Sequence, residues 1–98
     1  MESRIQDKAE TLRLPPILDL KAAAPLREQL LGLRGKPVEL DGAEVQRLGG
    51  LCLQVLLSAR DSWHNDGLPF SLGAASEAFD QSLSLFGVHA DEFQSSGV

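Results

Sequence analysis

Apolar and polar positions along this chain follow two different periods. Residues 11–14 and 38–40 alternate between polar and apolar side chains, which predicts half-buried strands. The segment 68–72 predicts a third strand, and a further edge strand is possible around Arg4 and Ile5. Residues 21–34, 51–66 and 77–86 place apolar side chains at helical spacing instead. The alternation predicts an α/β fold: a mixed, mostly parallel sheet of about four strands with about three helices packed on it.

Local signals at the ends of these segments support the assignment. Asp19 and Ser76 precede the first and third predicted helices, and both are good N-cap residues. Pro25 is tolerated in the first helix only near its first turn. Gly35, Gly67 and Gly87 follow the three predicted helices, where a left-handed residue commonly ends a helix.

The second predicted helix is apolar over most of its circumference, so we expect it to pack on more than one side. Trp63, near its end, either continues the packed stripe or forms an exposed anchor for a partner. In the third helix, the stripe is expected to contain Phe79, Leu83 and Phe86.

Length and composition bound the remaining possibilities. Ninety-eight residues fit one domain, which we place at residues 1–88, with residues 89–98 as a flexible tail. The net charge of −5, with no basic run, argues against nucleic-acid binding. A single cysteine excludes internal disulfides, and no apolar run is long enough to span a membrane. No secretory signal occurs at the N-terminus, so we expect a cytoplasmic protein. We also expect neither a cofactor nor a metal.

Three features allow a chemical as well as a structural interpretation. Gly49 and Gly50, before the second helix, can cradle a phosphate or simply permit a tight turn. Cys52 can be an activated thiol or a small buried residue. Asp19 and Asp41 end adjacent strands, where they can bind a cation, act as an acid–base pair, or serve as cap and turn former.

The turns that connect strands to helices are the expected location of a site. In a parallel sheet the turns at residues 17–21, 41–50 and 73–76 meet at the carboxyl ends of the strands, so we expect them at one end of the molecule. Polar residues of the long loop are the best candidates for specific contacts. The predicted docking residues are Asp19, Asp41, Glu44, Gln46, Arg47, Gly49, Gly50, Leu51 and Gln54.

Two segments resemble a known family. LDLKAAAPLREQLL (18–31) resembles the strand-to-helix entry of the STAS domain, the family of anti-sigma factor antagonists. VELDGAEVQRLGGLCLQVLLSA (38–59) resembles that family's V-x-L-D-x-S-x-V-x-x-I-D-S-S-G-L-x-x-L-L segment. The match spans about residues 10–87. It implies a cytoplasmic STAS-like domain that works by docking to proteins rather than by catalysis.

The chain departs from the family where the family is regulated. In switching STAS domains a kinase phosphorylates the serine after the aspartate of D-S-S-G-L, and the phosphate blocks docking. Here that aspartate aligns with Gly49 and that serine with Gly50, and no hydroxyl side chain occurs between Val38 and Leu57. The resemblance therefore implies a docking surface with a degenerate phosphoacceptor position at Gly50.

Three functions follow from these interpretations. The first is a non-catalytic module of bacterial signal transduction that docks to a chemotaxis histidine kinase or an anti-sigma-type kinase. The second is a cytoplasmic accessory subunit of an ABC transporter for lipids. The third is a small enzyme, for which the sequence offers no nucleophile–base constellation.

Overall fold

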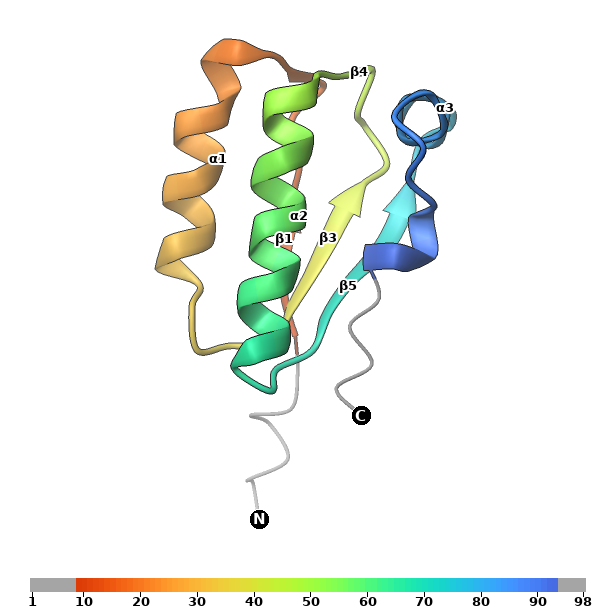
Figure 1. The fold of residues 1–98 in the computed structure, drawn as a ribbon. Coiled ribbons are helices and arrows are strands. Elements are labelled where there is room, and N and C mark those ends of the chain that lie inside the picture. The colour runs from red at the N-terminus through yellow and green to blue at the C-terminus, as the bar shows by residue number, and fades with distance from the viewer. Residues whose placement is uncertain (1–8, 94–98) are drawn as a thin grey trace.

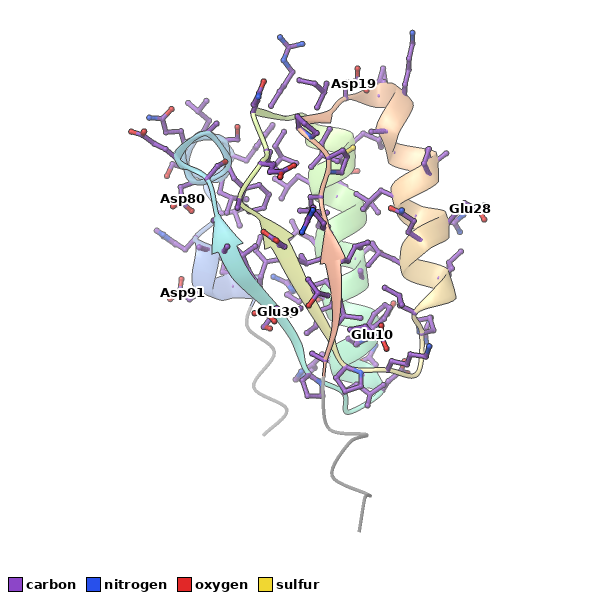
Figure 2. All side chains as sticks on the ribbon, turned by 180° about the vertical axis from the view of Figure 1, so that it is seen from behind. Glu10, Asp19, Glu28, Glu39, Asp80 and Asp91 are labelled. Carbon is purple, nitrogen blue, oxygen red and sulfur yellow. The ribbon has the colours of Figure 1, made fainter. Side chains whose placement is uncertain are left out.

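The computed structural model describes residues 9–93, which form an α/β domain (Figure 1). Three parallel strands, β1 (Glu10–Arg13), β3 (Val38–Gly42) and β5 (Phe70–Ala75), form one sheet in the order β1-β3-β5. Helices α1 (Leu20–Gly32) and α2 (Gly50–Asn65) lie side by side on one face of this sheet. Figure 2 shows the other face, where Glu39 lies and no described helix covers the strands.

The remaining elements surround this layer. Strands β2 (Ile17–Leu18) and β4 (Arg47–Leu48) form a separate two-stranded parallel sheet. Helix α3 (Glu77–Leu85) follows β5, and a short 3-10 helix, η2 (Ala90–Phe93), ends the described part. The predicted α/β fold with three helices and a mostly parallel sheet is therefore confirmed. The further edge strand expected around Arg4 and Ile5 lies outside the described residues.

The register of the sheet explains how the alternating pattern builds a core. Leu12 pairs with Leu40, and Leu40 pairs with Leu72, so three leucines form one row across the strands. All three are buried under the helices, whereas the neighbouring pair Glu39 and Ser71 is only half-buried. Because successive side chains of a strand point to opposite faces, the sheet has one apolar face under the helices and one more polar face.

Trp63 belongs to the core rather than to an exposed anchor. Only 1% of its surface is exposed, and its ring centroid lies 5.5 Å from that of Phe70. Its indole Nε1–H donates a hydrogen bond of 2.6 Å to the backbone carbonyl of Lys36. The packing interpretation is therefore confirmed, and the buried indole N–H is satisfied.

The predicted caps are present. Asp19 Oδ1 accepts hydrogen bonds from the backbone N–H groups of Lys21 and Ala22, at 3.1 and 3.2 Å. Ser76 Oγ accepts one from the Phe79 N–H at 3.0 Å. Pro25 differs from expectation: it is the sixth residue of α1, beyond the first turn, because the helix starts at Leu20 and continues through it.

The C-terminal part of the fold extends further than expected. Phe93 is fully buried, and its ring centroid lies 6.4 Å from that of Phe79. The packed structure therefore reaches beyond residue 88, where the flexible tail was expected to begin, because Phe93 fills space beside α3. Phe86 shows the opposite difference: it follows the last residue of α3 and is 49% exposed instead of belonging to the buried stripe.

Candidate functional site

The three strand-to-helix turns meet at one end of the molecule, as predicted. The Gly49 N–H donates to the Leu18 carbonyl at 2.9 Å, which joins the starts of α1 and α2. The Ser76 N–H donates a hydrogen bond to the Gly42 carbonyl at 3.0 Å. The Ser76 hydroxyl donates another to the Val45 carbonyl. In Figure 1 this end is the upper one, at the N-termini of α1 and α2.

The long loop after β3 is held by backbone hydrogen bonds to the segment before α1. The N–H groups of Gln46 and Arg47 both donate to the Pro16 carbonyl, at 2.7 and 3.1 Å. Ile17 pairs with Arg47 in the register of β2 and β4. Pro16 has no N–H of its own, so it contributes to these contacts through its carbonyl.

Every third residue of this loop is buried, and this pattern decides which side chains face solvent. Val45 and Leu48 are buried, with 1% and 5% of their surface exposed. The side chains between and beside them are exposed, and so are three residues of the first helical turns of α2. We call the exposed set the corner surface: Glu44, Gln46, Arg47, Gly50, Leu51 and Gln54.

The other three predicted docking residues are only partly accessible. Gly49 is half-buried beneath the corner surface, and the carboxylate of Asp19 caps α1. Asp41 alternates with the buried residues Leu40 and Gly42, so its side chain leaves the sheet on the face away from the helices. There Asp41 Oδ1 accepts a bond of 3.0 Å from the Ala43 N–H, while its other oxygen lies 3.9 Å from Arg13 Nε.

The cap and turn-former interpretations of the two aspartates are therefore confirmed. Each carboxylate serves its own turn, Asp19 at the start of α1 and Asp41 at the end of β3. Within residues 9–93, no group of three or more histidine, cysteine or acidic side chains is arranged to hold a metal ion.

The connection from β4 to α2 is short, since Gly49 alone separates Leu48 from the first residue of α2, but it needs no conformation reserved for glycine. Gly49 is the N-cap of α2 with φ −90° and ψ 167°, an extended conformation that any residue adopts. In the described part of the chain, positive φ occurs at Gly35, Gly67 and Gly87. A Cβ on Gly49 would lie 3.4 Å from the Leu18 carbonyl oxygen, and one on Gly50 would lie 3.5 Å from Phe86 Cε1. Both positions therefore have room for a small side chain.

Cys52 is a structural residue of the core. It is fully buried, and its thiol donates to the Asp19 carbonyl with a sulfur–oxygen distance of 3.2 Å. Burial, and secondarily the negative charge of Asp19, raises the pKa of the Cys52 thiol. A nucleophilic thiol needs the opposite shift, so the interpretation as a buried small residue is supported.

Sequence reasoning missed the apolar side chains that flank the corner surface. Phe86 lies against Gly50, Ile17 stands beside Arg47, and Leu20 follows the Asp19 cap. Their exposed fractions are 49%, 40% and 74%, and Leu51 within the surface is 46% exposed. Position was the available signal for two of them: Leu20 begins α1 and Phe86 follows α3, where a helical stripe no longer dictates burial.

The arrangement defines a class of protein: an α/β domain that presents a mixed polar and apolar surface at the N-terminus of a helix. The family model described as "Mlab, STAS domain" matches residues 1–94, almost the whole chain. The chain therefore belongs to the STAS domain family. STAS domains are generally non-catalytic modules that mediate protein–protein interactions. No curated protein matches the chain significantly.

A membrane-spanning helix would need about 20 apolar residues. Within residues 9–93, no helix combines the length and the apolar character that crossing a membrane requires.

Proposed function

We propose that this STAS domain is a non-catalytic docking module of cytoplasmic signal transduction, and that the corner surface binds a histidine kinase or an anti-sigma-type kinase. The observation that supports this most is the construction of the loop. Val45 and Leu48 anchor it in the core, Pro16 holds it from the side, and Glu44 and Arg47 project from it. A loop held in this way presents its side chains with little entropy left to lose on binding.

The chemistry of the corner surface suits a protein partner. Glu44 and Arg47 supply opposite charges that set the orientation of a partner, and Gln46 supplies hydrogen bonds. Leu51 and Phe86, about half exposed, add apolar area beside them. Interfaces gain most of their affinity from a few such apolar or aromatic side chains and their specificity from the polar residues around them.

The proposed docking is not released by phosphorylation at the usual place. Gly50 is the first residue of α2, where the resemblance puts the phosphoacceptor serine. A phosphate there would add nearly two negative charges at the centre of the corner surface. Glycine accepts none, so we propose that the partner's state or the abundance of this protein controls binding.

A second candidate is an accessory subunit of an ABC transporter. The exposed apolar side chains Ile17, Leu20, Leu51 and Phe86 favour it. Permanent interfaces are more apolar than transient ones, and a subunit that never leaves its partner needs no release switch. In this case the corner surface would cover a transporter component instead of a kinase.

Affinity capture tests both candidates. The domain is used as bait in lysate of the source cells, separated into soluble and membrane fractions, and retained proteins are identified by mass spectrometry. Retention of a signalling kinase that is lost with Glu44→Arg/Arg47→Glu supports the first candidate. Retention of a transporter ATPase from the membrane fraction supports the second, and retention of neither contradicts the proposed function.

A further inference from the structure

A groove of about 400 Å³ runs between α1 and α2, the two helices that lie side by side in Figure 1. Leu30 and Leu31 of α1 line one wall, and Leu51 and Val55 of α2 line the other. Trp63 closes the groove near the end of α2. Helix α2 is apolar over most of its circumference, yet α1 covers only part of it. Some of the apolar side chains that α1 leaves uncovered line the groove.

The apolar walls of the groove are not fully covered. Leu31 is 48% exposed and Leu51 46% exposed, and Val55 between the helices is half-buried. Leaving large apolar side chains in water costs roughly 25 cal/mol for each Å². Exposed apolar side chains that line a groove between two helices are typical of a binding surface.

The charge of the groove is opposite to that of the chain. The protein has 14 acidic and 9 basic residues, yet the charged side chains that line the groove are Arg27 and Arg34, with no carboxylate. Arg34 lies 3.0 Å from Asp66 and stacks over Trp63, 5.8 Å from its ring centroid. Arg27 is exposed and forms no ion pair within residues 9–93.

The dimensions of the groove fit a helix. Its walls are helices of 13 and 16 residues, about 20–24 Å long at a rise of about 1.5 Å per residue. A third helix can lie between two neighbouring helices, as amphipathic helices do in other helix-lined grooves. We propose that this groove binds an amphipathic helix of a partner protein, with an apolar stripe on the groove floor and carboxylates facing Arg27 and Arg34.

This groove is a second surface and does not rest on the proposed function. It shares Leu51 and Gln54 with the corner surface at one end only. Its arginines lie on α1 and the turn after it, away from Glu44 and Arg47. Substitutions in the two surfaces therefore test the two proposals separately.

The test uses three synthetic helical peptides with one leucine stripe and flanks of glutamate, glutamine or lysine, titrated into the isotopically labelled full chain. NMR should show shifts confined to α1 and α2, with the glutamate peptide binding at least about tenfold more tightly than the lysine peptide. Arg27→Glu should reverse this order. Arg13→Glu makes the same charge change on β1 and should leave the order unchanged.

Several results would overturn the proposal. These are equal affinity for the three peptides, shifts mapped elsewhere, or no binding of the glutamate peptide at ~1 mM. Self-association that Arg27→Glu abolishes would assign the groove to a second copy of the chain. Binding to anionic vesicles in preference to the glutamate peptide would assign it to a lipid surface.

Discussion

The thiol of Cys52 donates a hydrogen bond of 3.2 Å to the backbone carbonyl of Asp19, the residue that caps α1. This contact between residues 33 positions apart in sequence joins the starts of two helices. Together with the bond from the Gly49 N–H to the Leu18 carbonyl, it fixes the base of the corner surface. The cysteine is thus part of the scaffold of the candidate site and not part of its chemistry.

The first prediction concerns the reactivity of this thiol. Cys52 is fully buried and its pKa is raised, so iodoacetamide should modify it roughly two orders of magnitude more slowly in the folded protein than in urea. Mass spectrometry of timed samples at neutral pH gives both rates. Similar rates in the two states would show that the start of α2 is open.

The raised pKa of Cys52 also predicts a pH dependence of stability. Above the ordinary thiol pKa of 9.0, the unfolded chain loses the proton that the folded chain retains. Unfolding then becomes more favourable as pH rises, and the stabilisation is lost as pH passes through the higher folded pKa. Urea denaturation at a series of pH values should show wild type losing stability faster than Cys52→Ala above pH 9.0. Parallel curves would contradict this.

Ser76 is predicted to support the loop as well as its own helix. Its hydroxyl caps α3 through the Phe79 N–H and bonds the Val45 carbonyl inside the loop. Ser76→Ala should therefore cost about 1–2 kcal/mol of unfolding free energy in urea denaturation. Hydrogen exchange of the Gln46 and Arg47 amides should become faster. Ser84→Ala, on an exposed position of the same helix, is the control and should change neither measurement.

A capping side chain at the N-cap position of α2 is predicted to increase the stability of the protein. Gly49 caps the helix without a side-chain hydrogen bond. Gly49→Asp should stabilise the protein by a few tenths of a kcal/mol, about the difference between glycine and aspartate at an N-cap. Gly49→Ala adds the same Cβ without an acceptor and should be less stable than Gly49→Asp by ~1 kcal/mol. A clash with the Leu18 carbonyl, 3.4 Å from the Cβ, would instead make both variants unstable to a similar extent.

Restoring a hydroxyl at Gly50 tests whether the phosphorylation switch was lost through this residue. Gly50→Ser should fold normally, because its Cβ would lie 3.5 Å from the Phe86 ring, an ordinary contact. Incubated with a partner kinase and ATP, this variant should gain one phosphate by intact mass and lose affinity for the partner. Gly50→Ala is the control without a hydroxyl. Phosphate on the wild-type chain that weakens binding equally would contradict the proposed loss of the switch.

Much of the fold was predictable because local chemistry and global fold agree here. The alternation around Leu40 and the caps at Asp19 and Ser76 place three strands and three helices correctly. The pairing of β2 with β4 was not predictable, since each strand has two residues and depends on bonds to Pro16. Periodicity gave no signal for these contacts.

The candidate site was predictable in place but not in composition. Parallel connections bring the strand-to-helix turns together, so the position of Arg47 and Gly50 at one end of the molecule followed from topology. The exposure of Phe86 and the burial of Phe93 depend on how the chain turns after α3, which has no periodic signal. The groove beside Arg27 depends on the packing of α1 against α2, which no single helix pattern determines.

The most direct test of the account is the affinity of the captured partner for two charge-matched variants, measured by calorimetry. Glu44→Arg/Arg47→Glu changes the corner surface, and Glu28→Arg/Lys36→Glu makes the same exchanges at exposed positions outside it. If the partner docks through the corner surface, the first variant should lose at least about tenfold in affinity while the second binds as wild type does. Equal affinities for both variants and wild type would contradict docking through the corner surface.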